Sequence, residues 1–272
     1  MSNPILNEKA AAQAAKAGWA APDPATAGQY QAPVTDGPVS TWHGGTFTIG
    51  GTFTIGGTVT ATGVLLVLLL AAATAGWMST TSAIAGGTSS FPGLAIGGIL
   101  VGFVCALVVS RKPMLARFLA PVYALGEGFF LGVISKYYDS VYNGIVVQAV
   151  GATLAVFLVM LTLYRTRILK VTDRFRRIVV GATMGLMMFY AVSFVISLFA
   201  GSGAISFFNS GSPIGILFSV LAAGLAAMML AVDFDLIEKG VQRGWPKGME
   251  WYAAFGLLTT LVWLYLALLR LL

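Results

Sequence analysis

The chain has 272 residues, of which 57% are hydrophobic and only 10% are charged, against roughly 25% charged residues in ordinary soluble domains. The net charge is +6, but the basic residues are scattered between apolar runs and form no continuous stripe, which excludes a nucleic-acid-binding surface. The composition therefore predicts an all-α polytopic membrane protein in a lipid bilayer.

Residues 1–57 are rich in Ala, Gly, Pro, Gln and Thr, and we expect them to form a disordered cytoplasmic tail ahead of a transmembrane domain at 58–272. The tail contains a tandem GGTFTI repeat, at 44–49 and 50–55. Two copies of six residues cannot bury a core. We therefore interpret the repeat as a slack linker.

Seven apolar segments follow, each near the roughly 20 residues that a helix needs to cross about 30 Å of hydrocarbon. We place them at 59–81, 94–110, 115–135, 144–164, 178–200, 213–236 and 249–271. Gly98 and Gly102, and again Gly128 and Gly132, have the GxxxG spacing that lets helices approach closely in lipid. The pattern predicts a close-packed seven-helix bundle.

The basic residues predict the orientation of this bundle. If the N-terminus is inside, all of them except Lys136 and Arg270 fall in the tail or in the inner connections. Basic residues accumulate on the cytoplasmic side of membrane proteins. We therefore expect a multi-pass protein of the plasma (inner) membrane with a cytoplasmic N-terminus and an outward C-terminus.

Four acids are candidates for chemistry, and Glu127 is the first of them. It lies about 12 residues into the third segment, or roughly 18 Å along the helix, near the middle of the membrane. An acid there costs on the order of 3 kcal/mol to insert, so Glu127 should face the protein interior or a wet cavity. It serves either as a hydrogen-bonded packing group or as part of an ion or proton pathway.

Asp233 and Asp235 end the sixth segment. Asp233 is 20 residues past Pro213, about 30 Å along the helix, and therefore near the inner boundary of the hydrocarbon. The two acids are about 200° apart around a helix, so we expect only Asp233 to face the interior. Asp235 should then face headgroups or basic residues such as Lys239 and Arg243. From the residues alone, a salt-bridge role and a functional site are equal alternatives.

Glu250 occupies the first turn of the last segment, where the helix dipole favours a carboxylate. It enters from the same face as Asp233, so the two acids are candidates to meet. The single histidine, His43, lies in the tail, and the single cysteine, Cys105, lies in an apolar run. This leaves no histidine dyad and no zinc cluster within the bundle. We predict a protein that is not an enzyme and that holds no cofactor.

Several stretches resemble the Bax inhibitor-1/YccA-like family. They are DFDLIE at 233–238, the last helix from MEWYAAFG at 249–256 onward, and an EG..LG pattern in Glu127-Gly128 and Leu131-Gly132. The opening Ser2-Asn3-Pro4 and the Gly/Ala-rich tail resemble the actinobacterial branch. The resemblance covers about 59–272.

The resemblance implies a last helix wrapped by two groups of three, and a pH-sensitive leak of calcium or other cations controlled by carboxylates near the inner mouth. In the family an acid that Asp233 matches pairs with a second acid within the last helix. This sequence has Thr259 and Thr260 at that place, which leaves Glu250 and Asp235 as substitutes.

Two adjacent carboxylates share a proton and titrate as a pair, so rising pH would separate them and open a path. Calcium prefers six to eight oxygen ligands, so a few carboxylates such as Asp233 and Glu127 would bind it only weakly. The leading hypothesis is therefore a calcium or cation leak channel. The alternatives are a non-conducting regulator that binds a membrane protease or another membrane complex, as YccA-like relatives suggest, and a proton-coupled transporter.

Overall fold

The computed structural model describes residues 51–85, 93–200 and 213–272. Over these residues the chain forms seven α-helices and one short 3-10 helix, and each predicted apolar segment corresponds to one α-helix in the predicted order. The bounds are α2 (Ile55–Ala85), α3 (Gly93–Arg111), η2 (Pro113–Leu115), α4 (Ala116–Val141), α5 (Ile145–Arg165), α6 (Asp173–Ala200), α8 (Pro213–Gln242) and α9 (Met249–Leu271). The predicted all-α class is confirmed for this part of the chain.

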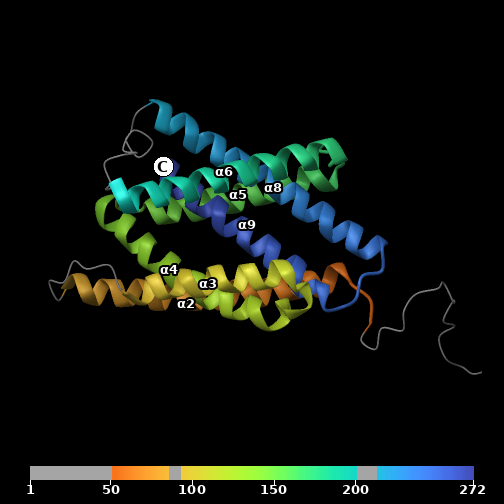
Figure 1. The fold of residues 1–272 in the computed structure, drawn as a ribbon, viewed down its shortest axis with the longest axis horizontal. Coiled ribbons are helices and arrows are strands. Elements are labelled where there is room, and N and C mark those ends of the chain that lie inside the picture. Colours follow the sequence, from red (N-terminus) through yellow and green to blue (C-terminus); the bar gives the residue numbers. More distant parts are fainter. Residues whose placement is uncertain (1–50, 86–92, 201–212) are drawn as a thin grey trace, which may run out of the picture. The chain divides into compact units, whose positions relative to one another are not determined.

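The last helix, α9, lies between two groups of helices (Figure 1). Helices α2, α3 and α4 form one group, and α5, α6 and α8 form the other. Leu258 belongs to a buried apolar cluster with α2, α3 and α4, whereas Leu257 and Leu264 belong to a second cluster with α8. Half of the apolar stretch of α9 is buried, against 6% of that of α6. The central last helix that the family resemblance implies is therefore present.

Six of these helices are long and apolar enough to cross a membrane. The remaining one, α3, contributes the shorter apolar stretch Ala95–Arg111, at the lower limit of spanning length. Large apolar side chains are exposed along the outer faces, for example Val147, Leu154 and Leu158 on α5. Such a surface needs lipid around it. The chain is a multi-pass membrane protein.

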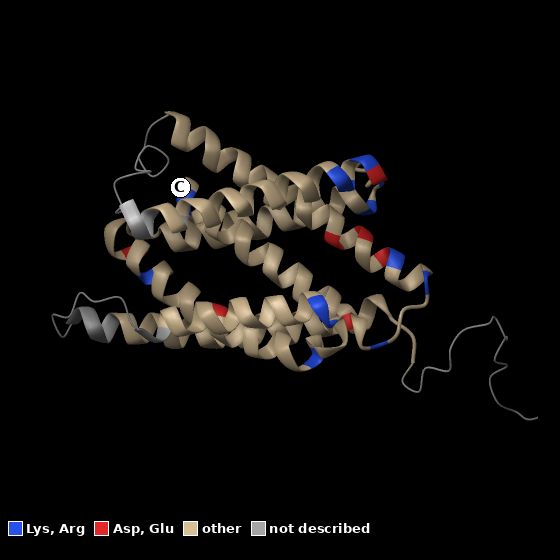
Figure 2. Ribbon diagram, viewed as in Figure 1, with Lys and Arg blue, Asp and Glu red and all other residues tan. Residues whose placement is uncertain are grey.

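The charged residues gather mainly at one end of the bundle (Figure 2). The connections from α3 to α4, from α5 to α6 and from α8 to α9 all lie at this end, which we call the charged end. These are the three connections that the basic residues of the sequence marked as inner. Lys136 and Arg270 lie in the parts of α4 and α9 that point away from the charged end.

The two GxxxG pairs mark close approaches of helix backbones. A Cβ atom at Gly132 of α4 would lie 1.9 Å from the Ala73 carbonyl oxygen of α2, and one at Gly128 would lie 2.3 Å from the Leu69 carbonyl oxygen. On the other face of α4, a Cβ at Gly98 of α3 would lie 2.6 Å from the carbonyl oxygen of Gly126. Only glycine fits such approaches. The close packing predicted from the GxxxG spacing is confirmed.

The stretch before α2 is fixed to the connection between α8 and α9. The Phe53 N–H donates to the Trp245 carbonyl at 2.8 Å, and the Lys247 N–H donates to the Gly51 carbonyl at 3.2 Å. The Phe53 side chain is 2% exposed and packs edge-on against the Trp245 ring. We call residues 51–54 with 245–247 the N-terminal clasp.

The clasp corrects the expectation of a slack linker for residues 51–57. The alternation of Thr and Phe lets Thr52 form an antiparallel bridge with Pro246 while Phe53 enters the core. Helix α2 then begins at Ile55, three residues before the predicted domain boundary. The first copy of the repeat lies outside the described residues.

The glycine packing predicts the effect of one methyl group. We expect Gly132→Ala to lower the free energy of unfolding by about 1–3 kcal/mol, because the new methyl group overlaps the Ala73 carbonyl. Gly151→Ala on α5 is the matched control, since a Cβ there meets nothing within 4 Å. It should leave stability unchanged or raise it by about 0.5–1 kcal/mol. Denaturant titration in detergent measures both, and equal unfolding energies would contradict the packing.

Candidate functional site

Asp233 is buried between α8 and the central helix. Its side chain is 6% exposed and its Oδ1 atom faces Gly256 of α9, where a Cβ would lie 3.9 Å away. The carboxyl group lies within interaction distance of the Thr260 hydroxyl, one turn further along α9. Its Oδ2 atom has no hydrogen-bond partner among the described residues. Asp233 is therefore a buried acid with one neutral partner.

The Thr260 hydroxyl is already committed as a donor. It donates to the Gly256 carbonyl at 3.1 Å, so its oxygen is left as an acceptor. A protonated Asp233 can donate to that oxygen without disturbing this bond, whereas a charged Asp233 has to compete for the single hydroxyl proton. The hydroxyl oxygen can therefore accept from Asp233 while its proton stays hydrogen-bonded to the Gly256 carbonyl.

A second acid lies in the opposite group of helices. Glu127 lies at the middle of the Pro113–Val141 span, beside Gly102 of α3, where a Cβ would be 3.2 Å from its Oε2 atom. Tyr123, one turn earlier on α4 and 5% exposed, interacts electrostatically with Glu127 and lies beside Thr259 of α9. Glu127 is half-buried, as its mid-membrane position predicts.

These contacts form a line of polar groups through the centre of the bundle. Thr259 and Thr260 are neighbours about 100° apart around α9, so one faces α4 and the other faces α8. We call the set Glu127, Tyr123, Thr259, Thr260 and Asp233 the polar belt. It joins the two helix groups across the helix that both of them contact.

Asp235 is buried like Asp233, and it forms an ion pair with Lys239. It is 8% exposed, so the prediction that only one of the two aspartates faces the interior is wrong. The reason is that α8 contacts α2, α5, α6 and α9 and is covered on more than one side. The expected pairing with Lys239 is present, with 2.6 Å between Oδ2 and Nζ in an ion pair that falls outside hydrogen-bond geometry.

Glu250 caps a different helix from the one that carries it. Its Oε1 atom accepts the Thr54 N–H at 3.0 Å and the Thr54 hydroxyl at 2.9 Å, and the Gly57 N–H donates to the Thr54 Oγ1 atom at 3.0 Å. A capping box normally joins a Thr to a Glu three residues later. Here Gly57 stands at that third position, and Glu250 of α9 supplies the carboxylate.

Thr260, not Glu250, therefore stands beside Asp233. Gly256, which Asp233 faces, is six residues after Glu250, or about 9 Å along α9. The Glu250 carboxylate instead lies at the beginning of α2. Backbone N–H groups there lack helical partners, and the helix dipole favours a negative charge. The group of α9 that lies beside Asp233 is therefore the neutral side chain of Thr260.

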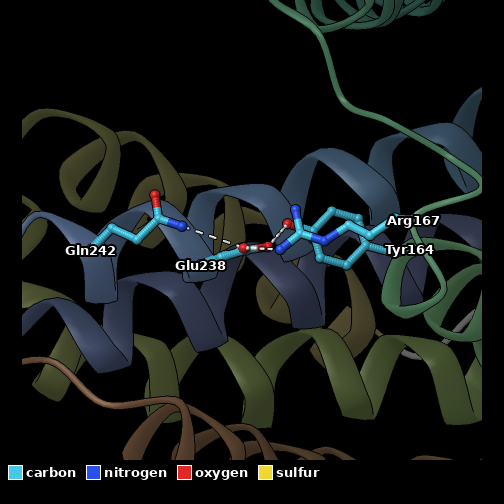
Figure 3. Close-up of polar contacts among 4 residues, drawn as sticks. All are labelled: Tyr164, Arg167, Glu238 and Gln242. Atoms are coloured by element: carbon cyan, nitrogen blue, oxygen red, sulfur yellow. Dashed lines mark hydrogen bonds and ion pairs between the residues drawn. The ribbon is translucent and has the colours of Figure 1, made fainter.

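A polar cluster around Glu238 was not predicted from the sequence (Figure 3). Its carboxylate accepts the Tyr164 hydroxyl, lies 2.5 Å from Nη2 of Arg167 and accepts the Gln242 side-chain amide at 3.3 Å. The i, i+4 spacing of Glu238 and Gln242 is a signal that the sequence contains. Tyr164 and Arg167 are more than 70 residues away, and only the packing of α5 on α8 brings them near.

The belt does not assemble a chelating site for a metal ion. Within the described ranges, no three His, Cys, Asp or Glu side chains come together. Asp233 and Glu127 lie in different helix groups, with Thr259 and Thr260 between them. Calcium at these two acids, one at a time, stays a prediction.

Comparison with known families supports the resemblance noted in the sequence. A model of the family described as Bax inhibitor 1 like matches residues 3–272, nearly the whole chain. Searches of curated proteins and of solved structures found no significant match.

Because Glu250 of α9 caps α2 beside Gly57, mutations at Glu250 and Gly57 should have non-additive effects on the free energy of unfolding. Glu250→Ala should lower the free energy of unfolding by about 1–3 kcal/mol, because the Thr54 N–H and hydroxyl lose their charged acceptor. Gly57→Ala should cost about as much, because its Cβ would lie 2.2 Å from the Glu250 carboxylate and displace it.

The double variant should then cost little more than either single change, which a double-mutant cycle in detergent measures. Glu250→Gln retains an acceptor oxygen and serves as the control with a smaller loss. Fully additive costs would show that Gly57 and Glu250 act independently.

Proposed function

The chain belongs to the Bax inhibitor 1 like family, and on this premise we propose that it is a pH-sensitive, non-enzymatic leak channel for calcium or other cations. In this proposal the polar belt is the gate, and Asp233 is the group whose protonation controls it. Asp235 and Glu250 then have structural roles, as an ion pair and as a helix cap. Permeant cations meet Glu127 and Asp233 in passing.

The observation that carries the proposal is the unpartnered Oδ2 atom of Asp233 on the central helix. As a neutral acid, Asp233 can hold α8 to α9 through Thr260. Loss of the proton leaves a buried charge with no cation within ion-pair distance among the described residues. Because such a charge is costly in a dry interior, water or a cation has to enter, and α8 separates from α9. Conduction should therefore rise with pH.

We further propose seven crossings of the plasma (inner) membrane, with the charged end in the cytoplasm. The support is the gathering of the α3–α4, α5–α6 and α8–α9 connections at that end (Figure 2), together with the basic residues that these connections carry. The N-terminus is then cytoplasmic and the C-terminus is outside.

The channel proposal predicts a pH-dependent calcium flux that requires Asp233. In liposomes loaded with a calcium indicator, flux through the wild type should rise as pH rises. Asp233→Asn keeps the shape of the side chain but cannot ionise, so its flux should stay near the low-pH value of the wild type at every pH.

Asp173→Asn is the control, since this acid lies in the exposed first turn of α6, away from the belt. It should reproduce the wild-type profile. A wild type without flux at any pH, or an unchanged pH profile in Asp233→Asn, would overturn the channel proposal.

The second candidate function is a non-conducting regulator that binds a membrane protease or another membrane complex. The N-terminal clasp favours it, because the clasp fixes the end of the tail to the connection between α8, which carries Asp233, and α9. A partner that holds the tail would thereby act on both helices.

Two deletions distinguish the candidates. Removal of residues 1–50 leaves the clasp intact, whereas removal of 1–57 also deletes Phe53 and the Thr54 cap. For a channel, the shorter deletion should retain pH-dependent flux and only the longer one should destabilise the protein. Loss of a co-purifying membrane partner on the shorter deletion, from a protein that never conducts, would favour the regulator.

A further inference from the structure

An apolar groove of about 550 Å³ runs between α2 and α5 at the charged end of the bundle. Val59, Gly63 and Leu66 line its α2 side, and Phe157 and Leu161 line its α5 side. Its volume lies within the range of small-molecule sites. We call it the α2–α5 groove. It separates the two helix groups on one side of α9.

The mouth of this groove is polar and positively charged. Tyr164, Arg165, Arg167 and Glu238 lie at this end. Glu238 is already occupied by Arg167 and Tyr164 (Figure 3), and the Arg165 side chain has no ion pair or hydrogen bond among the described residues. Two arginines against one glutamate leave one uncompensated positive charge at the end of an apolar slot.

The surroundings limit what can fill the slot. The groove lies between two helices that cross the membrane, and its Val59 wall is 64% exposed, so its open side faces hydrocarbon. The acyl chains of membrane lipids can therefore reach the groove from its open side. The charged end also carries Lys170, Arg174 and Arg176 beyond α5, and each basic residue near a membrane surface attracts anionic lipid by about 1 kcal/mol.

We propose that the α2–α5 groove is a binding site for an anionic phospholipid. One acyl chain lies between α2 and α5 on a floor that includes Phe234 and Leu257, and the phosphate group lies at the mouth against Arg165. The exposed edge of Arg167, whose side chain is 68% exposed, supplies further N–H donors. The site is distinct from the polar belt and does not depend on conduction.

The test uses the full chain in liposomes that contain a phosphatidylglycerol with a photoreactive acyl chain, or the corresponding phosphatidylcholine. Mass spectrometry of the labelled peptides locates the lipid. We expect phosphatidylglycerol to label the facing residues of α2 and α5 more strongly than phosphatidylcholine does. Arg165→Gln should lower that labelling about fivefold, whereas Arg117→Gln, an exposed arginine at the same end, should not.

A second variant blocks the groove itself. Gly63→Phe places a ring in the slot, where a Cβ meets nothing within 4 Å, and should reduce groove labelling to background. Gly97→Phe makes the same change at an equally open glycine on α3 and should leave groove labelling intact. If Gly63→Phe alters the melting temperature, Val59→Trp provides the same block from an exposed position.

Wild-type groove labelling in both blocking variants would overturn the proposal. Equal labelling by the two lipids, unchanged in Arg165→Gln, would do so too. Cross-links between two copies of the chain through α2 and α5 would show that a second protein molecule covers the groove instead.

Discussion

A carboxyl group placed in hydrocarbon has to find its partners inside the protein, and this constraint organises the interior of the bundle. Four acids of α8 and α9 meet it differently. Asp235 uses a lysine one turn away, Glu250 uses the unpaired backbone groups at the beginning of α2, and Glu238 gathers a tyrosine, an arginine and an amide. Asp233 has only Thr260 and one oxygen without a partner. In the proposed channel, Asp233 is the group that changes its protonation state.

The sequence predicted the elements of this fold well, for a physical reason. In lipid, long apolar runs have to be helices, so seven runs predict the described helices with ends that differ by a few residues. The glycine spacing likewise predicted close packing of helices, but it did not predict that α2 and α4 are the pair that meet. The burial of Asp235 was not predictable from helix geometry alone, because it depends on how many neighbours cover α8.

The partners of the candidate residues were harder to predict than the residues themselves. Asp233, Glu127 and Glu250 are recognisable from depth and residue type, but Thr54 and Glu250 are 196 positions apart and no local pattern connects them. The Thr54 cap does carry a weak local signal, since a threonine precedes an apolar run. Its partner is recognisable only once the last helix is placed beside the first described one.

Asp233 and Phe234 show how one helix serves two sites. Asp233 faces α9 and the polar belt, whereas Phe234 lies on the floor of the α2–α5 groove and packs against Phe157 and Tyr164, each with 5.8 Å between ring centroids. Any displacement of α8 therefore changes both. Tyr164 in turn donates to Glu238, so α8 contributes the buried acid Asp233, Phe234 on the floor of the groove and Glu238 at its mouth.

The cap that α9 provides for α2 also has a consequence for how the protein is made. The first helix of the described bundle begins with a Thr54 whose acceptor is synthesised 196 residues later. Protein synthesis adds about 5–20 residues per second, so Glu250 is made on the order of ten to forty seconds after Thr54. During that interval the N-terminal turn of α2 and the apolar ring of Phe53 lack their native partners. A chain truncated before α9 lacks both the acceptor for Thr54 and the helix that the two groups of helices contact.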